Sequence, residues 1–152
     1  MERIGYQDIP VGMFEKLMSV EDLINHSSLD LKMLEMIRLR VSQINGCAYC
    51  VDMHHKELKH AGESELRMYS LSVWKETGYF SSKEQAVLDF TEKLTKVGQD
   101  GIPESVFQSL TYYFDKKEIA LITLAISQIN TWTRLMRTFQ FTPGNYLVKQ
   151  ES

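Results

Sequence analysis

Residues 31–61 read LKMLEMIRLRVSQINGCAYCVDMHHKELKHA, and this stretch decides the fold. Its first half repeats apolar residues at steps of three and four, which is the spacing of one face of an α-helix. Asn45-Gly46 then breaks the repeat, and glycine favours the left-handed backbone with which helices commonly end. The stretch therefore predicts two consecutive helices joined by a turn, the second running from about Cys47 to Ala61. The apolar face of the first consists of Leu31, Leu34, Ile37 and Val41, widened by Met33, Met36 and Ile44.

Helical spacing continues on both sides of this pair, and no segment alternates with a period of two for long enough to predict a strand. Ser81 and Glu84 have the spacing of a capping box, Pro103 opens another helix, and Asp115 caps the last long one. A chain of 152 residues suits one compact domain. We therefore expect an all-α, single-domain helical bundle of about seven helices over residues 1–152. The other expected helices cover residues 14–24, 63–76, 82–97, 103 onward and 115–136.

The charge balance excludes two classes of partner. Lys and Arg sum to 17 against 20 Asp and Glu, for a net charge of −3, and the basic residues are scattered. Neither nucleic acid nor a membrane surface is therefore expected as a partner. No run approaches the roughly 18 apolar residues of a membrane-spanning helix, and the N-terminus lacks the layout of a signal peptide. We expect a cytoplasmic protein.

Cys47 and Cys50 are the two cysteines of the chain, and they are three residues apart. A disulfide that closes so small a loop restricts the unfolded chain little, so a redox or metal-binding pair is favoured over a structural staple. A helix start presents unpaired N–H groups and the positive end of the helix dipole, and both stabilise a thiolate. Residues three apart share a helix face, so the two sulfurs can meet. His54 follows on the same stripe, and an imidazole is suited to taking a proton from a thiol.

Glu35 is the predicted partner of His54. In an antiparallel helix pair, residues at equal distances from the connecting turn lie side by side. The distances of Glu35 and His54 from Asn45-Gly46 differ by only two residues, an offset of about 3 Å along a helix. The sequence therefore predicts an activated nucleophile made of Glu35, His54, Cys50 and Cys47, in which the carboxylate orients the imidazole.

Two other interpretations of the cysteines stay open. Both could be small core residues, because a lone C-x-x-C occurs by chance. A zinc site would require four ligands, and Cys47, Cys50 and His54 supply three. His55 points off their stripe, and His60 lies more than a turn further along the helix. A thioredoxin-like fold would require strands around the pair, and the sequence predicts none.

The spacing of these residues resembles that of a known family. Glu35 is followed by eleven residues and then by C-x-x-C-x-x-x-H, which ends at His54. This pattern is similar to the peroxidase branch of the alkylhydroperoxidase D-like, carboxymuconolactone decarboxylase family, whereas the decarboxylase branch lacks the cysteine pair. Two later stretches also resemble the family, FSSKEQAVLDFTEKLT within residues 74–95 and INTWTRLMRTFQFTPG at residues 129–144. The resemblance implies an all-α bundle that assembles into trimers or hexamers.

The resemblance also implies roles for the site residues. Cys50 would attack the peroxide and become a sulfenic acid, Cys47 would condense with it to form a disulfide, and Glu35 and His54 would relay protons. The position of Cys47 at the helix start slightly favours Cys47 as the thiolate, so the residues alone leave the attacking cysteine open. The best-known peroxidase of the family has an additional histidine between its cysteines, where this chain has Tyr49. Tyr49 can donate a hydrogen bond but is a weak acid, and it is a supporting candidate.

The predicted function is that of a peroxidase-like thiol oxidoreductase that reduces hydroperoxides through a Cys47–Cys50 dithiol/disulfide cycle. No cofactor or metal is expected, because the cysteines carry the electrons, and an unidentified protein or small-thiol reductant must restore the thiols. A protein disulfide reductase and a redox-sensing oligomer without turnover are the alternatives. The last helix is apolar on nearly all faces, which favours a homo-oligomer. Its apolar residues are Ile119, Leu121, Ile122, Leu124, Ile126, Ile129 and Trp132.

Overall fold

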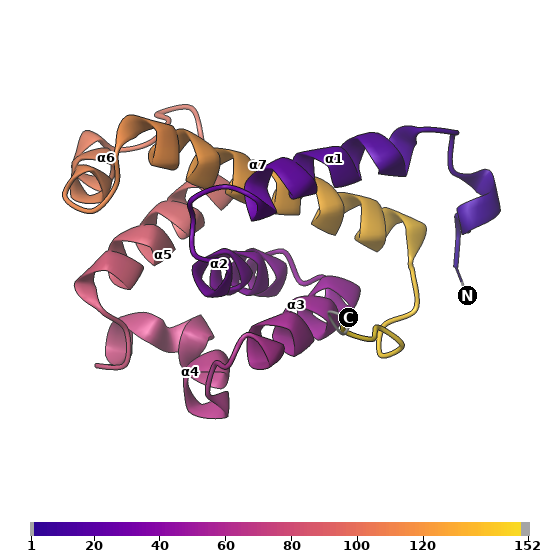
Figure 1. Cartoon of the computed structure of the whole chain (residues 1–152), viewed down its shortest axis with the longest axis horizontal. Coiled ribbons are helices and arrows are strands. Elements are labelled where there is room, and N and C mark those ends of the chain that lie inside the picture. Colours follow the sequence, from indigo (N-terminus) through magenta and orange to yellow (C-terminus); the bar gives the residue numbers. More distant parts are fainter. Residues whose placement is uncertain (1, 150–152) are drawn as a thin grey trace.

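The computed structural model describes residues 2–149 and contains seven α-helices and no strand in this range (Figure 1). The prediction of an all-α bundle of about seven helices is confirmed. Two short 3-10 segments, η1 (Tyr6–Asp8) and η2 (Leu71–Glu76), accompany the helices. None of the helices in this range is long and apolar enough to span a bilayer. They are α1 (Met13–Asn25), α2 (Leu31–Ile44), α3 (Ala48–His60), α4 (Glu65–Ser70), α5 (Ser82–Thr95), α6 (Glu104–Thr111) and α7 (Lys116–Phe139).

The helix α2 lies at the centre of the molecule, where Figure 1 shows it nearly end-on. It packs against α3, α5 and α7. Every side chain from Met33 to Leu39 is buried, which is wider than the apolar face that the sequence spacing predicts. Two of these buried residues, Glu35 and Arg38, are charged. Because a buried charge requires a partner, these two residues mark a polar group inside the core.

Two helix starts lie where their capping residues predict them. The side chain of Ser81 accepts the backbone N–H of Glu84, and that of Asp115 accepts the backbone N–H of Glu118. In each case the glutamate side chain bonds back to the N-cap backbone, so both helices begin with a complete capping box.

The expected helix over residues 63–76 is wrong in its extent. The helix α4 ends at Ser70, and the chain continues as η2, in which Val73 leaves the helical region with φ −125° and ψ 26°. Leu71 and Trp74 of η2 are both buried. Residues three apart lie directly above one another in a 3-10 segment, and both of these side chains face the core.

The apolar faces of α7 are covered within the single chain. The helices α1, α2 and α5 pack against it, and Figure 1 shows α1 running along its upper side. A helix that is apolar all round therefore finds its partners inside the chain, and the homo-oligomer stays a prediction that rests on the family resemblance. Of the residues that suggested a subunit interface, Ile119, Ile122, Ile126 and Ile129 are buried, and Leu121, Leu124 and Trp132 are half-buried against the same core.

Candidate active site

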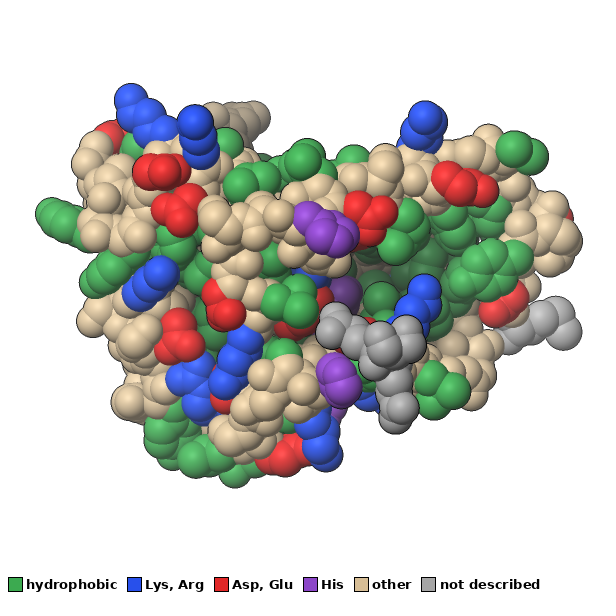
Figure 2. Space-filling view, viewed as in Figure 1, with side chains coloured by type: hydrophobic (Ala, Val, Ile, Leu, Met, Phe, Trp, Pro, Cys, Tyr) green, Lys and Arg blue, Asp and Glu red, His purple; other side chains and the backbone are tan. Residues whose placement is uncertain are grey.

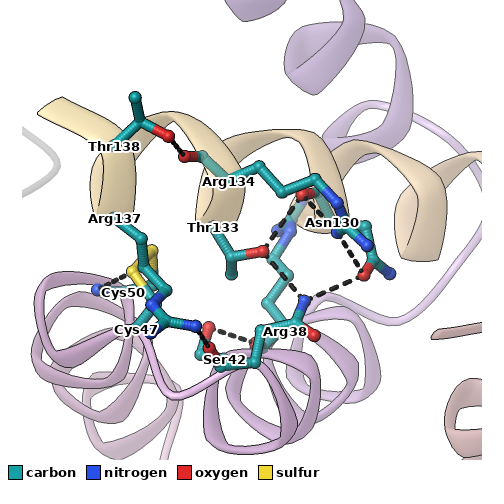
Figure 3. Close-up of a disulfide and its surroundings, with 10 residues drawn as sticks. Arg38, Ser42, Cys47, Cys50, Asn130, Thr133, Arg134, Arg137 and Thr138 are labelled. Carbon is teal, nitrogen blue, oxygen red and sulfur yellow. Dashed lines mark hydrogen bonds between the residues drawn. A yellow bond between two sulfur atoms is a disulfide. The ribbon is translucent and has the colours of Figure 1, made fainter. Parts of the chain in front are cut away.

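Cys47 lies at the start of α3 and is placed there by an anchored turn. The Asn45 side chain donates to Oδ1 of Asn130 and to Oγ1 of Thr133, both at 2.9 Å. Arg137 donates to the carbonyl of Asn45, also at 2.9 Å. Figure 3 shows these residues of α7 on the side of the helix that faces the two sulfur atoms. The turn between α2 and α3 is thus fixed to α7, which holds the cysteine pair in position.

Cys47 and Cys50 form a disulfide at the N-terminus of α3, with their Cα atoms 5.3 Å apart. Cys47 is the N-cap, and its sulfur accepts the backbone N–H of Cys50 at 3.3 Å. In the reduced protein a thiolate at Cys47 would receive this N–H bond and the field of the helix dipole. Cys50 lies inside the first turn, and His54 follows it by one turn. The helix start favours a thiolate at Cys47, whereas the spacing of His54 favours Cys50, so the choice of attacking cysteine stays a prediction from the family.

The disulfide is enclosed by an aromatic cluster that the sequence spacing did not reveal. Cys47 and Cys50 are only 1% and 2% exposed. The side chains around them come from α1, the end of α7, the N-terminal segment and the tail after α7, and Figure 2 shows hydrophobic side chains gathered in the hollow between α1 and α3. The ring centroids lie 5.0–6.4 Å apart in edge or tilted contacts. The aromatic residues of the cluster are Tyr6, Phe14, Tyr49, Trp132, Phe139 and Phe141.

His54 and Glu35 meet inside the core. Nδ1 of His54 lies 2.7 Å from Oε2 of Glu35, and the two residues are 8% and 6% exposed. The pairing of α2 with α3 brings them together across the turn, in the way that the sequence predicts. An ionised carboxylate accepts the N–H of the imidazole, which leaves Nε2 as the nitrogen that can accept a proton. This arrangement is suited to proton exchange with a thiol.

Arg38 contacts the other oxygen of the Glu35 carboxylate. It lies one turn beyond Glu35 on α2 and donates to Oε1 at 2.6 Å. Burial alone would raise the pKa of Glu35, but the charges and hydrogen bonds of His54 and Arg38 outweigh burial and hold this pKa below its usual value. Arg38 was not among the expected site residues, and its spacing of three from Glu35 was the available signal.

This lowered pKa predicts how stability depends on pH. Because the unfolded chain binds a proton at Glu35 more readily than the folded chain, the stabilisation from Glu35 is fully present above its ordinary pKa of 4.5 and is lost as the pH falls below it. We expect the free energy of unfolding, measured by urea titration, to fall between pH 5 and pH 3, and to fall less steeply in Glu35→Gln. Glu84 and Glu92 also have lowered pKa values, so part of the slope should remain. An identical slope in the variant would contradict this prediction.

Tyr49 lies half-buried on the first turn of α3, with its ring edge-on to Phe141 at 5.9 Å. Burial, and then the nearby charges of Tyr6 and Asp52, raise the pKa of Tyr49 above its ordinary value. Tyr49 is therefore a neutral phenol at neutral pH, which can donate a hydrogen bond but cannot act as the base that an imidazole provides. Its supporting role stays a prediction.

Within the described residues, Cys47, Cys50 and His54 do not form the ligand set that a zinc site would require. Within residues 2–149, no three His, Cys, Asp or Glu side chains gather in a group that could hold a metal ion. His55 instead lies 3.5 Å from a carboxylate oxygen of Glu65, and His60 is exposed.

A protein-family model matches the part of the chain that contains all four predicted site residues. The model of the carboxymuconolactone decarboxylase family matches residues 12–93, the part of the chain that contains Glu35, Cys47, Cys50 and His54. The uncharacterized protein YdfG of Bacillus subtilis (strain 168) is 35% identical over 135 residues, which are 88% of this chain and 91% of YdfG.

Two solved structures share the fold. A protein of unknown function from Agrobacterium tumefaciens, provisionally named as the antioxidant defence protein AhpD, is 37% identical with a TM-score of 0.90, covering 96% of this chain and 100% of that one. The AhpD core of an uncharacterized peroxidase-related protein from Ralstonia eutropha JMP134 has a TM-score of 0.77 over 87% of this chain and 70% of its own. At 22% identity, this second likeness shows the fold alone. The chain belongs to the carboxymuconolactone decarboxylase family, and its fold is that of the AhpD-like proteins.

Proposed function

We propose that this protein is a peroxidase-like thiol oxidoreductase, which reduces hydroperoxides through a Cys47–Cys50 dithiol/disulfide cycle. The observation that carries the proposal is the disulfide at the start of α3, one helical turn from a buried imidazole–carboxylate pair. A disulfide that closes so short a loop adds little to the stability of the fold, whereas a redox pair requires two sulfurs within bonding distance. Membership of a family with AhpD-like relatives supports the same chemistry.

The proposed reaction uses two thiols per hydroperoxide. One thiol gives its proton to His54, and the thiolate attacks the terminal oxygen of the hydroperoxide, so that the O–O bond breaks and the alkoxide leaves. The alkoxide takes the proton to become an alcohol, and the attacking sulfur becomes a sulfenic acid. The second thiol then displaces the hydroxyl, which leaves as water, and the disulfide forms. By resemblance to the peroxidase branch of the family, we propose Cys50 for the first step and Cys47 for the second.

A reducing partner must complete the cycle. Two electrons and two protons return to the disulfide when a dithiol exchanges with it through a mixed disulfide. We propose a protein or small-molecule thiol as this partner. The enclosure of the sulfurs by aromatic side chains also supports a substrate with an apolar group, because burial of apolar surface favours binding.

We expect the reduced protein to lose two free thiols per chain on treatment with mild hydroperoxide, and to recover both on addition of a dithiol. With the dithiol in excess, peroxide should be consumed over many turnovers, and the Cys47→Ser and Cys50→Ser variants should lose that turnover. Thiol titration and peroxide consumption measure the two results.

The outcomes separate the proposal from its alternatives. Persistence of both thiols under conditions that oxidise a control dithiol enzyme would contradict a redox role altogether. Stoichiometric oxidation with a changed oligomer size in light scattering, and without turnover, would indicate a redox sensor. Turnover of a protein disulfide in place of peroxide would indicate a disulfide reductase.

A further inference from the structure

Arg38 joins the candidate catalytic pair to a second buried network. Arg38 is 3% exposed, and its guanidinium donates through Nη1 to Oε1 of Glu35 at 2.6 Å. Nη2 donates to Oε2 of Glu21 at 2.8 Å and to Oδ1 of Asn25 at 2.7 Å, both on α1. The fork geometry of a guanidinium is what allows one side chain to hold three partners on two helices.

We propose that Arg38 is a positioning residue for the thiol reaction, because it fixes the Glu35 carboxylate in the orientation that faces His54. The role of Arg38 in turnover rests on the proposed function. Arg38 contacts neither sulfur in the network described, and it acts through Glu35.

The geometry of the carboxylate carries this inference. Oε1 of Glu35 bonds to Arg38 and Oε2 lies 2.7 Å from Nδ1 of His54, so each oxygen has one fixed partner. Without the guanidinium, the carboxylate would be free to turn about its last bond and to lose alignment with the imidazole. A misaligned orienting group weakens proton transfer, even when both members of the pair are present.

The net charge of this buried network also acts on His54. Glu21 and Glu35 share one guanidinium, so the buried set carries one negative charge until His54 takes a proton. This charge favours acceptance of a proton from a thiol. Among the other groups close to the set, the hydroxyl of Tyr146 donates to Glu57 on α3. Burial, then this hydrogen bond, and then the charges of Glu57 and Glu35 raise the pKa of Tyr146 above its ordinary value.

The network also extends to the sulfur side of the site. Glu21 accepts the indole N–H of Trp132 through Oε1 at 2.8 Å. The ring of Trp132 packs against the apolar cluster that encloses the disulfide, and it contacts Phe14 with centroids 5.3 Å apart. Arg38 therefore links the imidazole–carboxylate pair to the apolar cluster that encloses the sulfurs.

Arg40 provides a matched control on the same helix. Its Nη2 and Nε donate to Oε1 of Glu92 at 2.8 and 3.1 Å, and Glu92 also accepts the indole N–H of Trp74 at 2.8 Å. The chain thus has a second network in which an arginine of α2 bonds to a glutamate that also accepts an indole N–H. Arg40 contacts Glu92 and Gln43, and its network does not include Glu35 or His54.

The test measures the rate at which iodoacetamide alkylates the reduced protein, and the rate of its oxidation by hydroperoxide, across a range of pH. Arg38→Met should slow both reactions about tenfold at neutral pH and move the pH profile, which is less than the loss expected on removal of the base itself. Arg40→Met should keep the wild-type profile. In a Glu35→Gln background, Arg38→Met should add little further loss, because the two residues act as a unit.

Arg38→Lys keeps the proposal testable if Arg38→Met does not fold. Its ammonium keeps the charge but cannot span the three partners, so the rate should lie between those of wild type and Arg38→Met. A folded Arg38→Lys or Arg38→Met with the wild-type rates and profile would overturn the proposal, as would losses that add to those of Glu35→Gln or an equal loss in Arg40→Met. A shifted alkylation profile in a protein without peroxide turnover would support the positioning role and contradict the proposed function.

Discussion

Glu35→Gln is expected to slow oxidation of the reactive thiol by hydroperoxide about 10²–10⁴-fold, the usual contribution of a general base, while the fold is kept. The amide has nearly the shape of the carboxylate but cannot accept a proton or carry the charge that Nδ1 of His54 meets at 2.7 Å. His54→Ala should produce a similar loss. The double variant should be little worse than either single one, because an orienting carboxylate acts only through its imidazole.

The matched control for this prediction is Glu92→Gln. Glu92 is also a carboxylate bonded to an arginine of α2, but its partners are not part of the apolar cluster around the disulfide. It should leave the rate of thiol oxidation unchanged. If the cysteines were inert core residues, Glu35→Gln would alter stability alone, and if they held zinc, His54→Ala would release metal that elemental analysis detects. Additive losses in the double variant would show that Glu35 and His54 act independently.

Arg38→Met is expected to lower the free energy of unfolding by about 3–5 kcal/mol, the usual loss when one partner of a buried ion pair is removed. The variant leaves the carboxylates of Glu21 and Glu35 without their shared guanidinium, and the side chains of Arg38 and Glu35 are 4% and 8% exposed. Urea-induced unfolding at neutral pH, followed by circular dichroism, measures the change.

Two variants check the cause of this loss. Arg38→Met combined with Glu35→Gln should be less destabilised than Arg38→Met, because one stranded charge has been removed. Arg40→Met should lose less than Arg38→Met, since the more exposed Glu92 keeps its bonds to Trp74 and Lys75. A loss of under about 1 kcal/mol in Arg38→Met, typical of a surface pair, would show that solvent replaces the guanidinium without penalty.

Local signals in the sequence were sufficient for much of the fold. The capping boxes at Ser81 and Asp115 mark helix starts because the partner of each cap is three residues away. The break at Asn45-Gly46 was enough to pair α2 with α3 and to predict that Glu35 lies near His54, a proximity that the structure contains. These inferences succeed because they depend on neighbours along one helix or across one turn.

The features that the sequence did not predict depend on contacts between distant parts of the chain. The partners of Arg38 lie on α1, and no periodic pattern in α2 shows that α1 crosses there. Phe14 of α1 and Phe141 meet at the end of α7, against which α1 packs, with their ring centroids 6.4 Å apart. The even apolar coverage of α7 suggested a subunit interface, although neighbouring helices of the same chain account for it.

The enclosure of the disulfide has a consequence for the rate law of its reduction. In-line attack by an external thiol on the sulfur of a cysteine that is only 1–2% exposed requires a covering segment to move first. The backbone N–H of Arg3 donates to the carbonyl of Phe139 at 2.8 Å, and Lys56 holds the tail through the carbonyls of Gly144 and Tyr146 at 3.1 and 3.0 Å. With opening as an obligatory step, the observed rate rises with reductant concentration only until it equals the opening rate, and then saturates. A bimolecular exchange thereby becomes a gated, first-order process, whose ceiling is set by the few hydrogen bonds that hold the covering segments.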